Sequence, residues 1–163
     1  MDERVKAAIE ALLRAFPPAA LEPSEALREW GRTYTDHEAF ERGVSGRTWV
    51  DLPAAFLERQ HDALPFLGPR SFATYLPAYV TAVLRRGPEL DALPGFLAGT
   101  LTRDLDDGDR FDARVSALSG EQRRAIARAL EALEASATTA HDRARWSAAL
   151  DGYWRSVASE TAR

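Results

Sequence analysis

Residues 71–86 read SFATYLPAYVTAVLRR, and this stretch decides the fold. An apolar stripe runs along it at the spacing of one helix face, through Phe72, Tyr75, Leu76, Tyr79, Val80, Val83 and Leu84. The stripe keeps its phase across Pro77, and two separate helices would have no reason to stay in phase. The pattern therefore predicts one helix that continues through the proline.

Pro77 destabilises such a helix. Proline has no N–H to donate to the carbonyl of Ala73 and crowds that carbonyl, which costs ~3 kcal/mol in a helix interior. One interpretation is that the resulting kink lets the helix wrap around the core. The other is that the released Ala73 carbonyl and two tyrosines line a cleft. A break at Leu76 also stays open, because a residue before proline disfavours helical geometry.

Outward from this stretch, apolar spacing and capping signals predict further helices over residues 5–16, 24–30, 36–42, 52–57, 90–101, 119–133 and 139–159. Residues 48–50 are compatible with a short extended piece, and residues 102–114 form the most polar loop. No segment of strand length alternates apolar and polar residues. The prediction is an all-α fold, a single compact domain over residues 1–163 with about seven helices and a central helix kinked at Pro77.

The composition excludes several classes of protein. The chain has 163 residues, 45% hydrophobic and 28% charged, which is typical of a soluble globular domain. It has no cysteine, so disulfides, thiolate metal sites and a cysteine nucleophile are excluded. The net charge is −4 and no basic block stands out, so no nucleic-acid partner is expected. No apolar run approaches a membrane span and the first residues lack a signal-peptide pattern, so we expect no membrane association and a cytoplasmic location.

Several short motifs resemble a family of uncharacterised bacterial proteins, a domain of unknown function. The most distinctive motif is FLGPRSFATYLPAY at residues 66–79, preceded by Trp49 and Leu52. It is followed by Arg-Phe at residues 110–111 and by LSGEQRRAIARALEAL at residues 118–133. The resemblance covers roughly residues 49–133. It implies a helical bacterial protein and carries no catalytic residue to transfer.

The aromatic residues suggest one candidate site. Most of them fall at helical spacing, which is typical of core packing, and buried tyrosine and tryptophan need a partner for their polar atoms. The alternative is a cleft or partner-binding edge beside the proline, formed by Trp49, Phe72, Tyr75, Pro77 and Tyr79.

An acidic run suggests a second candidate site, at Asp104, Asp106, Asp107 and Asp109. Hard cations need several oxygen ligands at close quarters. An EF-hand needs glycine at loop position six and glutamate at position twelve, and a loop starting at Asp104 provides neither. The remaining interpretations are a solvated loop, an acidic partner-binding surface or a cation site of another kind.

No residue pattern predicts a catalytic, cofactor or metal site. His37, His61 and His141 have no mutual metal-ligand spacing, and no serine stands in a nucleophile elbow. The favoured function is a non-enzymatic interaction module that binds a cognate protein, as an immunity or adaptor protein does. The alternatives are a small-molecule or peptide binder with an aromatic cleft near Pro77, and an enzyme that uses His61, Asp62, Tyr75 and Tyr79. The sequence does not indicate the oligomeric state.

Overall fold

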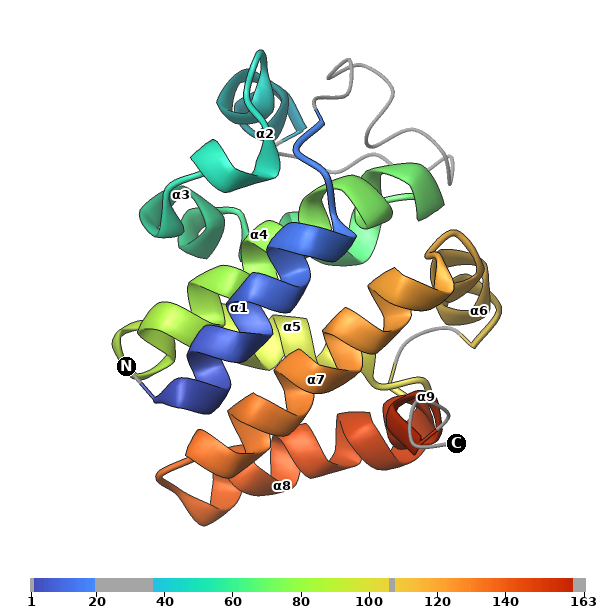
Figure 1. The fold of residues 1–163 in the computed structure, drawn as a ribbon. Helices are drawn as coiled ribbons and strands as arrows, with labels where there is room; N and C mark the ends of the chain where they lie inside the picture. Colours follow the sequence, from blue (N-terminus) through green and yellow to red (C-terminus); the bar gives the residue numbers. More distant parts are fainter. Residues whose placement is uncertain (1, 20–36, 106–107, 160–163) are drawn as a thin grey trace.

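The computed structural model describes residues 2–19, 37–105 and 108–159, and every regular element in these ranges is helical (Figure 1). The α-helices are α1 (Glu3–Ala15), α2 (His37–Val44), α3 (Ala54–Arg59), α4 (Pro69–Arg86), α5 (Leu93–Leu101), α6 (Gly108–Ser116), α7 (Gly120–Ser136), α8 (Ala140–Ala149) and α9 (Arg155–Ser159). Shorter 3₁₀ helices are η2 (Trp49–Asp51), η3 (His61–Phe66) and η4 (Gly87–Glu89). The all-α prediction is confirmed, with nine α-helices among the described residues where about seven were expected.

Helix α4 confirms the phase argument, because it runs without a break from Pro69 through Pro77 to Arg86. Pro69 occupies its first turn, where a missing N–H costs no hydrogen bond. Twelve of its eighteen residues are buried, so the helix is enclosed on most sides instead of presenting one apolar stripe. It contacts α1, α3, α5, α6 and α7, and is therefore the central helix of the fold.

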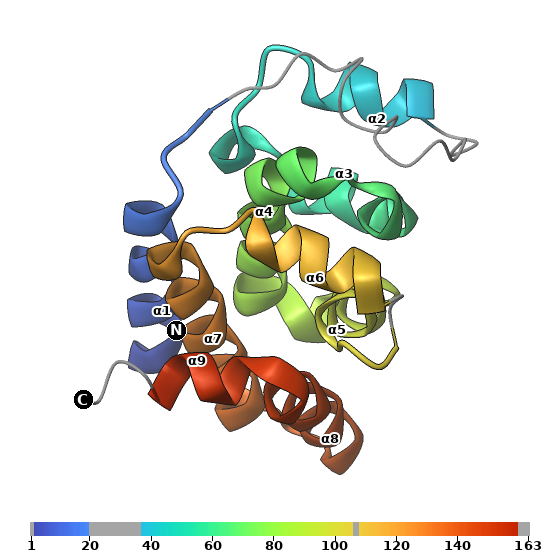
Figure 2. The same ribbon diagram turned by 90° about the vertical axis from the view of Figure 1, so that its right-hand side faces the viewer.

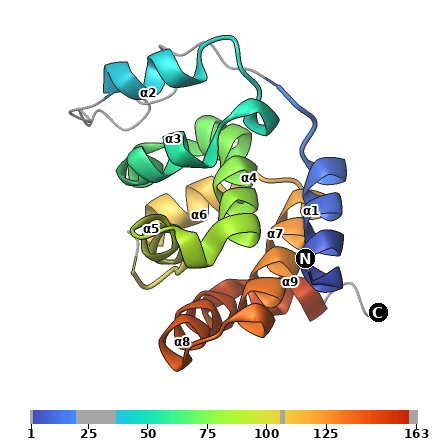
Figure 3. The same ribbon diagram turned by 90° about the vertical axis from the view of Figure 1, so that its left-hand side faces the viewer.

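The other helices are arranged around α4. Helices α1 and α7 lie side by side and run in opposite directions (Figure 1). Figures 2 and 3 show α4 between this pair on one side and α5 and α6 on the other. The buried apolar side chains form one continuous cluster from Val5 to Val157. The two ends of the chain thus contribute to the same core.

Two helix starts follow from their sequence signals. Ser119 Oγ accepts a hydrogen bond from Gln122 N at 3.1 Å, and Gln122 Oε1 accepts one from Ser119 N at 2.9 Å. This is the capping box expected at the start of α7. Asp2 caps α1 by accepting from Arg4 N at 2.7 Å. The helix predicted over residues 24–30 lies outside the described residues.

Two local predictions are corrected, and the extent of the predicted last helix is confirmed. Of residues 48–50 only Thr48 is extended: Trp49–Asp51 is a 3₁₀ turn, and the Asp51 carboxylate accepts a hydrogen bond from Thr48 Oγ1 at 2.7 Å. Part of the predicted polar loop is helix α6, which buries Phe111 and Val115 against the core. The predicted last helix contains a π-helical segment, η5 (Leu150–Trp154), at which the axis turns between α8 and α9 (Figure 2).

Candidate functional site

The aromatic residues of the predicted cleft lie inside the core. Phe72, Tyr75 and Tyr79 are fully buried, and Pro77 is buried between them. The Tyr79 hydroxyl donates to the carbonyl of Gln60 at 2.9 Å, so the polar end of this buried side chain has a hydrogen-bond partner within the protein. These side chains therefore do not form an open cleft.

Trp49 has a different position, because its ring lines a surface groove although little of it is exposed. Its Nε1 donates to the carbonyl of Phe16 at 3.0 Å and so ties η2 to the end of α1. The groove has a volume of about 350 Å³ and lies between α1, η2, α3 and α4. We call it the α1–α4 groove, and its main lining residues are Leu13, Trp49, Val50, Ala78, Thr81 and Arg85.

The α1–α4 groove has an apolar rim and two polar groups. Leu13 is 46% exposed and Val50 is 45% exposed, although both side chains are large and apolar. The Thr81 hydroxyl is shielded from solvent and has no hydrogen-bond partner among the described residues. Arg85 lines one end of the groove. A ligand with an apolar body and a hydrogen-bonding group fits this combination.

A second groove lies over α5 and is lined by Pro65, Gly95, Phe96, Gly99 and Leu105, with a volume of about 420 Å³. We call it the α5 groove. Leu105 is 74% exposed and Phe96 is 39% exposed. Nothing lies near the position that a Cβ would take on either glycine, so the helix backbone is open to close approach. Large apolar side chains left in solvent beside a bare helix face are typical of an interaction surface.

The acidic run adjoins the α5 groove in the chain, since Asp104 precedes Leu105. Asp104 and Asp109 are exposed, and Asp106 and Asp107 lie outside the described residues. Arg103 forms a two-pronged ion pair with Asp112, with N–O distances of 3.0 and 2.8 Å. Asp112 is therefore committed to Arg103 within the protein, whereas Asp104 has its carboxylate on the surface.

The Arg103–Asp112 pair makes a testable prediction about ionisation. The hydrogen bond from Arg103 holds the pKa of Asp112 below its ordinary value. A lowered folded-state pKa stabilises the fold above the unfolded-state pKa, and this contribution is lost as the pH falls through the lowered value. We expect Arg103→Gln to raise the pKa of Asp112 toward that of a free aspartate, measured by carboxyl ¹³C NMR. A pKa of Asp112 that stays low in Arg103→Gln would contradict this assignment.

Of the residues considered for catalysis, His61 and Asp62 lie in η3, and Tyr75 and Tyr79 lie in α4. The ring of His61 packs on Phe96, with centroids 4.4 Å apart, and its Nδ1 lies 2.6 Å from the carbonyl oxygen of Glu58. Tyr75 and Tyr79 are buried in the core, on the central helix. Within the described residues, no group of three or more His, Asp or Glu side chains is arranged to hold a metal ion. Among the described helices, none combines the length and apolar character that crossing a membrane requires.

Two buried arginines on α6 were missed by the sequence analysis. Arg114 donates from Nε to the carbonyl of Leu67 at 2.9 Å, and from Nη2 to that of Pro65 at 2.5 Å. Arg110 donates to the same Pro65 carbonyl at 3.0 Å. The guanidinium of Arg114 also lies over the ring of Phe72, 5.3 Å from its centroid. These arginines fix the connector that leads from η3 into α4, and Arg110 belongs to the Arg-Phe pair of the family motif.

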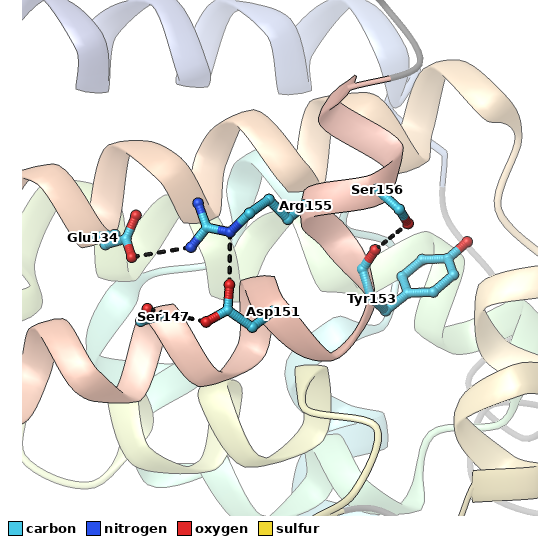
Figure 4. A network of polar contacts seen from close by, with 6 residues as sticks. All are labelled: Glu134, Ser147, Asp151, Tyr153, Arg155 and Ser156. Carbon is cyan, nitrogen blue, oxygen red and sulfur yellow. Dashed lines mark hydrogen bonds and ion pairs between the residues drawn. The ribbon is translucent and has the colours of Figure 1, made fainter.

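A surface network fastens the turn between α8 and α9 (Figure 4). Arg155 Nε donates to Asp151 Oδ1 at 2.6 Å, and its Nη2 pairs with Glu134 of α7 at 3.3 Å. The hydrogen bond to Asp151 is also the main reason why the pKa of Arg155 is raised. All three side chains are at least partly exposed, so this network stabilises the turn without forming a site.

In its described ranges the chain is all-helical, buries most of its aromatic side chains and leaves apolar side chains exposed along two grooves. The chain matches a family of unknown function, DUF6714, over residues 2–158, and it belongs to that family. The match extends beyond the segment 49–133 that showed the resemblance, and includes α1 and the helices after α7. No curated protein and no solved structure matches the chain.

Proposed function

We propose that this chain is a non-enzymatic interaction module that binds a cognate protein through the α5 groove. The observation that carries the proposal is the exposure of Leu105 and Phe96 above the bare backbone of Gly95 and Gly99. An amphipathic helix of a partner can approach such a face closely and bury both apolar side chains.

The charge beside the groove indicates the partner's chemistry. Asp104 is adjacent to Leu105 and exposed, and the chain as a whole has a net charge of −4. A partner helix with an apolar face flanked by lysine or arginine would complement both features. A bacterial immunity or adaptor protein of the cytoplasm is the concrete form that we propose, with neither nucleic acid nor membrane as the partner.

The test is site-specific photo-crosslinking in cells of the native host. A crosslinking residue replaces Leu105 in one variant and Val50, another exposed apolar residue, in the control. We expect the Leu105 variant to capture one protein through a basic amphipathic segment, and the control not to capture it. Capture of the same protein by both variants, or of none by the Leu105 variant, would contradict the proposal.

A groove-filling variant sharpens this test. Gly99→Leu adds a side chain where the structure has open space, and leucine raises helix propensity relative to glycine by about 1 kcal/mol. The variant is therefore expected to fold at least as stably as the wild type while losing the crosslink. A crosslink of unchanged yield in folded Gly99→Leu would show that the groove is not the contact surface.

The α1–α4 groove supports a second candidate function, binding of a small molecule or peptide near Pro77. The buried Thr81 hydroxyl, which has no partner in the described part of the chain, favours this function, because a ligand that hydrogen-bonds to the hydroxyl would stabilise it. Decanoate is a suitable probe, since its chain matches the apolar rim and its carboxylate matches Arg85. We expect binding by calorimetry that is lost in Leu13→Asp and retained in Leu105→Asp.

We also propose that α4 bends at Pro77 because of the proline itself and not because its neighbours require a bend. Pro77→Ala removes a helix penalty of ~3 kcal/mol and deletes two buried methylenes worth ~0.8 kcal/mol each. The free energy of unfolding, measured by urea denaturation, is therefore expected to rise by about 1 kcal/mol. A loss of stability in Pro77→Ala would mean that the packing around α4 depends on the bend.

A further inference from the structure

A third cavity, with a volume of about 640 Å³, lies at the end of the bundle where α1, α5 and α8 begin and α4 and α7 end. In Figure 1 the starts of α1 and α8 and the ends of α4 and α7 lie on the left-hand side. Its main lining residues are Arg85, Asp91, Leu133, Asp142, Arg145 and Trp146, and we call it the Trp146 cavity. Its volume lies within the usual range of about 300–1,000 Å³ for small-molecule sites.

The indole of Trp146 differs from the other described tryptophans. Trp49 and Trp154 each donate their Nε1–H to a backbone carbonyl, at 3.0 and 2.9 Å. Trp146 is buried to nearly the same extent, yet its indole has no acceptor among the described residues. Unlike the Thr81 hydroxyl, the indole N–H of Trp146 is not shielded from solvent, so it is a donor available to a ligand that enters the cavity. The apolar side chain of Leu133 lies beside it in the cavity wall.

Some charged side chains of the cavity are paired within the protein, and others are available to a ligand. Asp142 accepts from the Thr139 hydroxyl at 2.6 Å and pairs with Arg145 at 3.4 Å. Arg85 and Asp91 have neither an ion pair nor a hydrogen bond from their side chains within the described chain. Asp2 also lines the cavity and accepts from Arg4 N, so the cavity offers one available cation, one carboxylate without a partner among the described residues and an apolar wall.

This combination selects a class of ligand. Counting Asp2, three carboxylates and two guanidinium groups line the cavity, so a dianion such as a phosphate ester is disfavoured. We propose that the Trp146 cavity binds a zwitterion with an apolar body, such as a hydrophobic amino acid or dipeptide. Its carboxylate pairs with Arg85 and its ammonium group with Asp91. Its apolar side chains pack against Trp146 and Leu133.

The first experiment uses the dipeptide L-leucyl-L-phenylalanine and the indole N–H resonances of the ¹⁵N-labelled protein. Trp146→Phe identifies the Trp146 resonance by its disappearance. We expect the dipeptide to shift this resonance more than the other indole resonances, with a Kd on the order of 0.1–1 mM. If no resonance shifts at about 10 mM dipeptide, or if only the other indoles shift, the proposal is wrong.

The second experiment tests the two charges with matched probes and variants. N-acetylation removes the ammonium charge and C-terminal amidation removes the carboxylate, and each is expected to weaken binding about tenfold. Asp91→Asn should remove the preference for the free amine, while Asp104→Asn, an exposed carboxylate of the α5 groove region, should leave it unchanged. Equal binding of all three probes, or unchanged selectivity in Asp91→Asn, would overturn the proposal. Asp91 and Trp146 line neither groove described above, so these outcomes are independent of the proposed interaction function.

Discussion

Replacing Arg114 by methionine is expected to lower the free energy of unfolding by about 3 kcal/mol, because the Leu67 carbonyl loses its donor and the Pro65 carbonyl loses one of its two. The Arg114 side chain is only 1% exposed, and it donates to the carbonyls of Leu67 and Pro65. Methionine retains much of the packing of the arginine stem but donates nothing. Each buried carbonyl left without a donor costs about 1–3 kcal/mol. Arg110 still reaches the Pro65 carbonyl, which keeps the loss below the sum of the two.

Urea denaturation of three variants separates this effect from a general loss of charge. Arg110→Met should cost less than Arg114→Met, because Arg114 continues to donate to the shared Pro65 carbonyl. Arg103→Met, on the surface, should change stability less than either α6 variant. Arg114→Lys should lower stability nearly as much as Arg114→Met, because an ammonium group cannot donate to both carbonyls with the geometry of the planar guanidinium. A loss below about 1 kcal/mol in Arg114→Met would mean that water or a rearranged Arg110 replaces these bonds.

The prediction of α4 from the sequence succeeded because its evidence lay in the order of the residues. An apolar stripe that stays in phase across Pro77 requires a single helix, and Pro69–Arg86 is one. The start of α7 was predictable for a similar reason, since Ser119 and Gln122 cap it through local hydrogen bonds. In both cases the information that determines the structure lies within a few residues of chain.

Helix α6 could not be predicted in the same way. Its buried face consists of Arg110, Phe111, Arg114 and Val115, and a reading by hydropathy assigns both arginines to solvent. They are buried because the backbone carbonyls of the η3–α4 connector, more than 40 positions earlier in the chain, accept their hydrogen bonds. Only the tertiary structure brings these groups together, so the segment looked like a polar loop.

The candidate sites were also hard to predict, because they depend on contacts between distant parts of the chain. The sequence singled out Tyr75 and Tyr79 beside Pro77, but helical spacing alone does not say which face of an enclosed helix reaches solvent. Both rings are buried, and the Tyr79 hydroxyl bonds to Gln60. Leu105 lies within the acidic run and drew no attention in the sequence, yet it is the most exposed of the large apolar side chains described. Exposure depends on which surfaces neighbouring helices cover, and that information is not local.

Trp154→Ala is expected to destabilise the protein by about 5 kcal/mol, the largest single-residue effect that this structure implies. Trp154 is fully buried in the π-helical segment, and its ring meets those of Tyr153 and Phe111 edge to face at 5.0 and 6.2 Å. Truncating a buried aromatic side chain costs about 3–5 kcal/mol in lost burial and cavity formation. The hydrogen bond from Nε1 to the Leu101 carbonyl adds about 1 kcal/mol.

Trp154→Phe distinguishes the packing contribution from the hydrogen bond, since phenylalanine keeps an aromatic ring and removes the donor. Its expected cost is about 2 kcal/mol, from the unsatisfied Leu101 carbonyl and a smaller cavity. Trp49→Phe is the matched control, because it breaks an equivalent bond to Phe16 at the edge of a groove that water can reach. Its cost should therefore be smaller than that of Trp154→Phe. Urea denaturation measures the loss of unfolding free energy in both variants. Equal losses would show that the contact between α5 and the π-helical segment contributes no more to stability than the contact between α1 and η2.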